Sequence, residues 1–122
     1  MLRAGLIALV ALGAMISAAN ADCRTIAFAI HPFQNETIST TGVSTAGSAC
    51  THRFWSGSSL RFTSGAIVSR PSNGNLNEIG ALQFRYRPAA GFKGVDHYAV
   101  RVCGKGGGGA GCSTISYAIS VQ

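Results

Sequence analysis

The stretch Tyr86-Arg87-Pro88-Ala89-Ala90-Gly91-Phe92-Lys93-Gly94-Val95-Asp96-His97-Tyr98-Ala99-Val100-Arg101-Val102 holds the end of one strand, a loop and a second strand. After the loop, Tyr98, Val100 and Val102 alternate with residues of the opposite face, a period typical of a half-buried β-strand. Proline and glycine interrupt this pattern between Pro88 and Gly94. The stretch therefore predicts two β-strands joined by a Pro/Gly loop.

The same alternation recurs along the chain after residue 21. We expect strands at Thr25 to Ile30, Leu60 to Ser69, Asn75 to Glu78, Leu82 to Arg87 and Ile115 to Val121, and a weak edge strand at Thr37 to Thr41. Ser64-Gly65 predicts a bulge or bend. Short strands separated by turn residues, with no helical period, predict an all-β, antiparallel, Ig-like β-sandwich of about seven strands and two disulfides.

The side chains on the inward face of these strands form the predicted core. They are Phe28, Ile30, Leu60, Phe62, Phe84, Tyr86, Tyr98, Val100, Ile115, Tyr117 and Ile119. Asn73-Gly74 predicts a turn that tolerates positive φ, and Gly91 and Gly94 are further turn positions. We expect Asp96 to accept backbone amide hydrogen bonds where the next strand begins.

Several of these motifs recur in one family. The chain contains Pro71-Ser72-Asn73-Gly74, Tyr86-Arg87-Pro88, Gly91-Phe92, Gly94 and Asp96-His97-Tyr98 in the order found in that family. Between Ser59 and Val121 it resembles the bacterial immunoglobulin-like (cadherin-like) repeats of secreted and surface proteins. The resemblance implies an Ig-like fold and no particular chemistry. Unlike the acidic tandem arrays of the family, this sequence is basic and contains the motif once, so we expect a single exported domain and no calcium.

The first residues have the pattern of a Sec-type signal peptide. Arg3 is followed by an apolar run from Leu6 to Ile16, which is too short for a membrane span, and by the small-residue cleavage site Ala19-Asn20-Ala21. We expect a signal peptide at residues 1–21 and one domain at residues 22–122, periplasmic or secreted and monomeric, with no transmembrane span.

All four cysteines lie in the predicted mature domain. An even count in an exported chain predicts two disulfides, and the absence of close cysteine pairs argues against a metal site. Cys103 and Cys112 flank a glycine-rich hairpin tip, so we expect Cys103–Cys112 and Cys23–Cys50. A Cys50–Cys103 bridge between the sheets is the alternative.

The mature domain offers few groups for catalysis. Its histidines are His31, His52 and His97, which lack metal-ligand spacing, and its acids number four. No serine lies in a nucleophile-elbow sequence, and the glycine-rich run from Gly104 to Gly111 lacks the features of a phosphate-binding loop. We therefore expect no enzymatic activity, no metal and no cofactor.

The mature domain carries nine Lys/Arg and four Asp/Glu, a net charge of +5. Such a domain is attracted to anionic surfaces such as envelope polymers, and nucleic acid is not expected as a partner. Five cations are predicted to form a stripe on adjacent strands: Arg85, Arg87, Lys93, Arg101 and Lys105. Phe54-Trp55 is either an exposed aromatic contact for sugar or part of the core.

The sequence predicts an exported, non-catalytic binding domain that contacts an anionic envelope polymer or a protein. One alternative is a structural or accessory subunit of a surface assembly that pairs through an edge strand. Another is a small periplasmic enzyme inhibitor.

Overall fold

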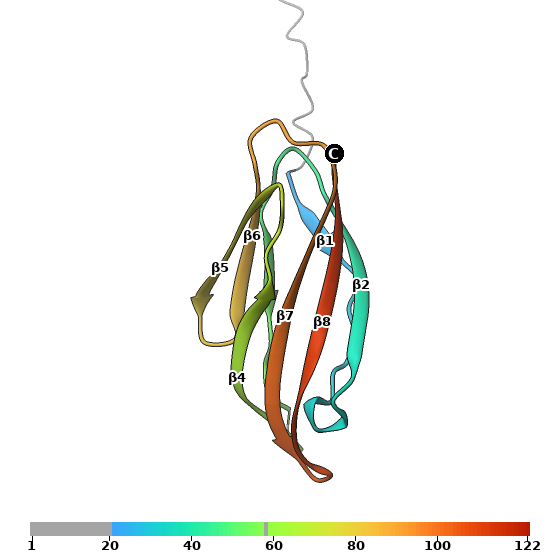
Figure 1. Ribbon diagram of the computed structural model, residues 1–122, viewed down its shortest axis with the longest axis vertical. Coiled ribbons are helices and arrows are strands. Elements are labelled where there is room, and N and C mark those ends of the chain that lie inside the picture. Colours follow the sequence, from blue (N-terminus) through green and yellow to red (C-terminus); the bar gives the residue numbers. More distant parts are fainter. Residues whose placement is uncertain (1–20, 58) are drawn as a thin grey trace, which may run out of the picture.

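Two β-sheets packed face to face form the protein in a computed structural model that describes residues 21–57 and 59–122 (Figure 1). The large sheet has the order β1-β2-β8-β7-β4 and the small sheet the order β3-β6-β5. The large sheet comprises β1 (Cys23–Thr25), β2 (Thr37–Ser44), β4 (Leu60–Ser69), β7 (Gly94–Gly106) and β8 (Gly109–Val121). The small sheet comprises β3 (Cys50–Arg53), β5 (Gly74–Gly80) and β6 (Gln83–Pro88). The predicted signal peptide lies outside the described residues except for Ala21.

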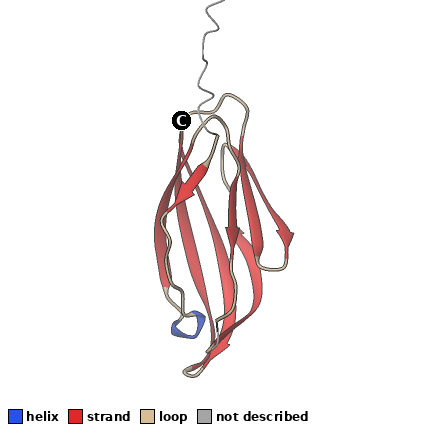
Figure 2. Cartoon of the chain, turned by 180° about the vertical axis from the view of Figure 1, so that it is seen from behind, coloured by secondary structure: helices blue, strands red, loops and turns tan. Residues whose placement is uncertain are grey.

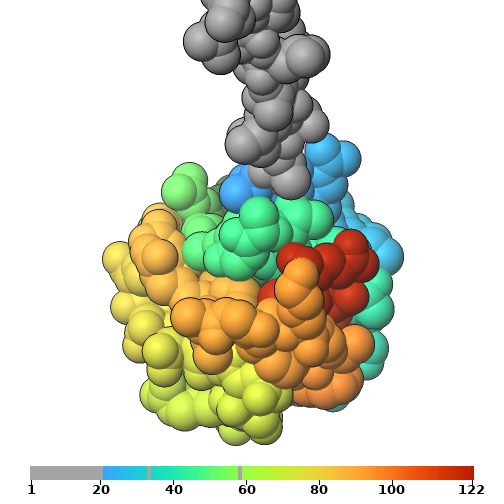
Figure 3. Space-filling view, turned by 90° about the horizontal axis from the view of Figure 1, so that it is seen from above, coloured from blue at the N-terminus to red at the C-terminus, as the bar shows by residue number. Residues whose placement is uncertain are grey.

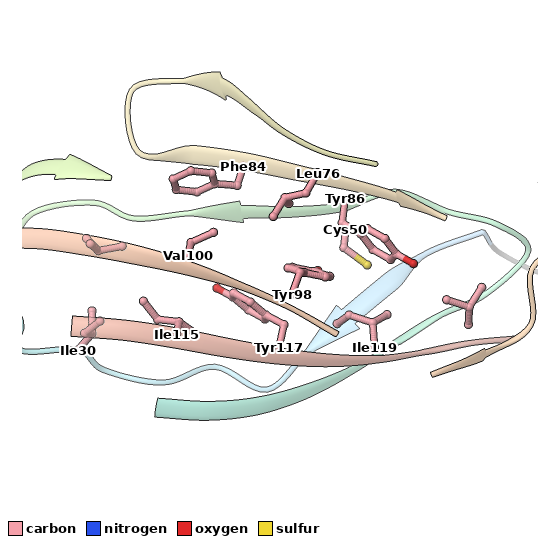
Figure 4. Close-up of a cluster of buried hydrophobic side chains, with 12 residues drawn as sticks. Ile30, Cys50, Leu76, Phe84, Tyr86, Tyr98, Val100, Ile115, Tyr117 and Ile119 are labelled. Carbon is pink, nitrogen blue, oxygen red and sulfur yellow. The ribbon is translucent and has the colours of Figure 1, made fainter. Parts of the chain in front are cut away.

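The core lies between the two sheets, where aromatic and β-branched side chains meet (Figure 4). Eight of the predicted core residues are buried, and Phe28 and Phe62 are half-buried against them. Leu60 is half-buried but outside this cluster, because it begins β4 at the far end of the sheet. The prediction omitted Cys50, Leu76, Val102 and Val121, which are also buried.

The strands with the clearest alternation form as predicted. β7 and β8 pair antiparallel from Gly94↔Val121 to Gly106↔Gly109, so the hairpin tip is only Gly107 and Gly108. Ile115, Tyr117, Ile119 and Val121 all point into the core. Because apolar side chains recur at every second residue, one face of this hairpin is buried. A shift of one residue would expose that face, so burial sets the register of the pair.

Both predicted disulfides are present, and the described residues contain no free cysteine. Cys103 and Cys112 are directly opposite in the β7–β8 ladder, with Cα atoms 4.0 Å apart. Cys23–Cys50 joins β1 of the large sheet to β3 of the small sheet. Two such bonds are compatible with an oxidising, exported location.

The N-terminal part of the fold differs from the prediction. Residues 21–57 and 59–122 form eight strands, and β1 ends at Thr25 instead of continuing to Ile30. Phe28 and Ile30 point inward from a segment that has left the sheet. The apolar side chains of this segment therefore alternate because they pack on the core, although the segment does not pair as a strand. Figure 2 shows this tan segment running from β1 to η1 (Pro32–Gln34), a single 3-10 turn.

β2 is neither weak nor at an edge. It lies between β1 and β8 and pairs with β8 in parallel over Thr37–Ser44, so the sandwich is not purely antiparallel. After Ile38, its inward residues Thr40, Gly42 and Ser44 are small or polar, which weakens the hydrophobic alternation. A side chain at Gly42 would lie 2.7 Å from Cγ2 of Thr25, so only glycine permits the close approach of β1.

The predicted turns and bulges are shifted in detail. The Gly91 and Gly94 positions have φ values of 78° and 138°. Asn73 and Gly74 do not have positive φ; Gly74 begins β5, where a Cβ would lie 2.6 Å from the Tyr86 ring. The register of β4 against β7 shifts twice, between Phe62 and Ser64, one residue before the predicted Ser64-Gly65, and again between Ile67 and Ser69.

The C-terminus and several loops meet at the end of the sandwich opposite the β7–β8 hairpin tip (Figure 3). The C-terminal residues lie beside the β6–β7 loop and the turn after β2. The backbone amide of Gln122 donates to the carbonyl of Ser44 at 2.8 Å, and Ala46 donates to the carbonyl of Gln122 at 3.1 Å. The end of β8 is therefore held by the turn that follows β2.

Phe84→Ala should lower the free energy of unfolding by about 3–5 kcal/mol, because this fully buried ring leaves a cavity. We expect the melting temperature to fall by more than about 10 °C in a domain of this size. Val68→Ala, at a side chain that is 52% exposed, is the matched control and should change it little. A Phe84→Ala melting temperature within a few degrees of the parent would contradict the inward assignment of β6.

Candidate binding surfaces

The predicted stripe of five cations does not form. Arg85 and Arg87 lie on β6 of the small sheet, whereas Arg101 and Lys105 lie on β7 of the large sheet. The prediction assumed that the Pro88 to Gly94 loop joins neighbouring strands of one sheet. That loop instead crosses from one sheet to the other and carries Lys93, which is exposed.

Arg85 and Arg87 instead share a surface with a third arginine. Inward Cys50, His52, Leu76, Phe84 and Tyr86 alternate with side chains on the outer face of the small sheet. We call this outer surface the cationic face. Its residues are Thr51, Arg53, Asn75, Asn77, Gln83, Arg85 and Arg87.

The register places these groups next to one another. Arg85 is paired with Thr51 on one side and Asn77 on the other, and its Nε donates to Oγ1 of Thr51 at 3.5 Å. Arg53 is opposite Gln83, and Arg87 is opposite Asn75. No acidic residue belongs to this face in the described part of the chain. Glu78 is opposite the inward Phe84, so it lies on the other side of the sheet.

The second candidate surface is a groove of about 900 Å³ along one lateral edge of the sandwich. One wall is the segment between β1 and η1, and the other is β3 with the residues after it. We call it the edge groove. It is lined by Thr25–His31, 51–55, Gly57, Ser59, Leu60, Phe62, Gly107, Gly108 and Tyr117.

The interior of the edge groove is aromatic. The Phe28 ring packs against Phe54 and Tyr117 with centroid distances of 6.5 Å in each case. Trp55 is 77% exposed and Ile26 is 64% exposed. Phe54 and Trp55 therefore have different roles, because Phe54 packs on the core and Trp55 is left on the surface. Arg53 is the one Lys/Arg among the lining residues, which include no acid.

His52 points from β3 into the core, and its ring stacks on Tyr117 with centroids 3.9 Å apart. Nε2 of His52 lies 2.5 Å from the Tyr98 hydroxyl. Burial lowers the pKa of His52 to about 4, so the ring is neutral at pH 7. Burial raises the pKa of Tyr98, so its hydroxyl keeps its proton and can donate to the histidine.

Asp96 is buried at the start of β7 and accepts four hydrogen bonds. The donors are the backbone amides of Ser72, Asn73 and His97 at 3.0–3.1 Å and the Tyr86 hydroxyl at 2.7 Å. The three backbone amide bonds are of the kind that the sequence predicts for Asp96, and the bond from the Tyr86 hydroxyl is an additional one. Burial, together with the hydrogen bond to Asp96, raises the pKa of Tyr86.

The side chains of the remaining histidines lie away from His52. His31 precedes η1 and His97 is exposed on β7. The described residues contain no group of three or more His, Cys, Asp or Glu placed to hold a metal ion. Within the same residues, no helix has the length and apolar character needed to cross a membrane.

The sequence interpretation missed two features that the structure reveals. Arg53 belongs to the cationic face, a position that the alternation of Cys50, Thr51, His52 and Arg53 already indicates. The edge groove has no such signal, because it depends on the segment after β1 leaving the sheet. A scan against protein-family models finds no match to this chain, and a search of curated proteins finds none either.

Stability should fall as the pH is lowered from about 6.5 to about 4. In this window the unfolded chain binds a proton at residue 52 that the folded protein excludes, so the loss at this site should reach about 3 kcal/mol. Urea unfolding at a series of pH values measures it. The control is His52→Phe combined with Tyr98→Phe, which leaves no buried hydroxyl without its partner. An equal pH dependence in the parent and the double variant would show that His52 is not the titrating group.

Proposed function

We propose that the protein is an exported, non-catalytic binding domain of Ig-like topology that binds an anionic envelope polymer through its cationic face. The observation that carries this proposal is the register of the small sheet. It gathers Arg53, Arg85 and Arg87 with amide and hydroxyl groups on one surface and leaves acidic residues out of it.

The strand order supports the Ig-like part of the proposal. In Ig domains strands B, E and D are neighbours in one sheet, and C, F and G are neighbours in the other. If β3 to β8 correspond to strands B to G, the orders β3-β6-β5 and β4-β7-β8 reproduce that arrangement. Loops and sheet faces of this architecture serve many kinds of recognition, so function must be inferred from the surface.

The arginines of the cationic face have no carboxylate partner among the described residues, which supports an anionic ligand. Of the nine Lys/Arg in the described residues, only Arg24 lies within 4.0 Å of a carboxylate, that of Asp22. The arginines of the cationic face are therefore not neutralised from within. Guanidinium groups bind phosphate and carboxylate oxygens through paired donors, and neighbouring asparagine and threonine side chains add neutral hydrogen bonds.

The engagement of the buried His52 and Asp96 side chains supports a non-catalytic role. His52 is engaged by Tyr98, and Asp96 is engaged by Tyr86 and three backbone amides. Neither group is free to exchange a proton with a molecule bound at the surface.

Arg85→Ser/Arg87→Ser should weaken binding to anionic polymer at least about tenfold at low salt, because two charge-assisted contacts are lost. Binding of the parent should also weaken steeply between about 50 and 500 mM NaCl. The measurement is binding to immobilised lipopolysaccharide, which presents phosphates, and to alginate, which presents carboxylates. Neutral dextran is the reference surface.

The matched control is Arg101→Ser/Lys105→Ser, which removes the same charge from the large sheet. It should retain most of the binding. Equal losses in the two double variants would mean that net charge, and not the cationic face, attracts the polymer. Absence of binding by the parent to both anionic surfaces at low salt would refute the proposed ligand class.

A further inference from the structure

β3 has one partner strand among the described residues, β6, so its other side is an open edge. The amide of Phe54 donates to the carbonyl of Leu82 at 3.0 Å, in the register that relates β3 to β6. Bonded and non-bonded pairs alternate along an antiparallel ladder. The backbone groups of Thr51 and Arg53 therefore point away from β6, toward the edge groove.

The opposite wall of the groove also presents unused backbone. The segment after β1 bonds to β2 through the amide of Ile26, which donates to Thr41 at 3.2 Å. No described residue makes a hydrogen bond to the backbone of Ala27, Phe28 or Ala29. At one end the Cys23–Cys50 disulfide holds the two walls together, and beyond it the walls diverge into the groove.

We propose that the edge groove binds an extended peptide segment of a partner protein, which adds to the small sheet as a strand beside β3. This site borders the polymer surface proposed above and shares Thr51 and Arg53 with it, but it uses the backbone edge of β3 and does not depend on polymer binding. The backbone N–H and C=O groups of Thr51 and Arg53 that face the open edge recur every second residue, about 7 Å apart, which is the repeat of a β-strand backbone. Strand addition uses such main-chain bonds for affinity and alternate side-chain pockets for specificity.

The lining of the groove defines the chemistry of the peptide. Alternate apolar side chains would pack on the Phe28 and Phe54 rings and beside the exposed Trp55. Arg53 on the same strand favours an acidic residue at the outer positions of the peptide. A second copy of this chain fits less well, because it would bring a further net charge of +5 from residues 22–122 to a groove without acids.

The test begins with selection of random heptapeptides displayed on phage against the folded domain. We expect selected peptides that alternate apolar and polar residues. Thr51→Pro should weaken their binding at least about tenfold, because proline removes an amide that the fold itself does not use. Thr51→Val keeps that amide and loses the hydroxyl, so it is the matched control and should bind within about twofold of the parent.

Hydrogen exchange on the unsubstituted protein tests the same claim without a variant that might misfold. Saturation with a selected peptide should slow exchange at the amides of Thr51 and Arg53, which face the open edge in the free domain. Failure to select any peptide above background would overturn the proposal. So would binding that leaves exchange at both amides unchanged, or that survives equally in a folded Thr51→Pro variant.

Discussion

The relative position of the two sheets depends on the hydrogen bonds accepted by the buried carboxylate of Asp96. It lies on β7 of the large sheet and accepts a hydrogen bond from Tyr86 on β6 of the small sheet. It also accepts the amides of Ser72 and Asn73, where the chain crosses from β4 to β5. Burying a charge is costly unless its hydrogen bonds are replaced, and four donors replace them here.

This inward anchoring determines what the small sheet presents to solvent. Because Tyr86 points to Asp96, its neighbours Arg85 and Arg87 must point outward. His52 is held inward by Tyr98 in the same way, so Thr51 and Arg53 point outward beside them. The Cys23–Cys50 bond fixes one end of β3 and leaves its remaining edge open. The cationic face and the edge groove thus follow from three links between the sheets.

Much of this arrangement is predictable from sequence where alternation is strong. The core residues of β6, β7 and β8 and the outward direction of Arg85 and Arg87 follow from a period of two. The Cys103–Cys112 disulfide follows from hairpin proximity, and Cys23–Cys50 is then the remaining pair. The cationic stripe was wrong because alternation specifies the face of a strand but not the sheet to which it belongs. β2 was predicted as a weak edge strand because most of its inward residues are small or polar. The edge groove was not predicted, because residues 26–30 alternate like a strand but do not form one.

The central claim is that the small sheet presents the polymer-binding surface. Chemical-shift mapping of the 15N-labelled domain with alginate oligosaccharides tests it most directly, since each backbone amide reports on its own surroundings. The largest shifts should fall on Thr51, Arg53, Asn77, Arg85 and Arg87, with little change along β7 and β8. Shifts centred on Arg101 and Lys105, or spread evenly over both sheets, would contradict it.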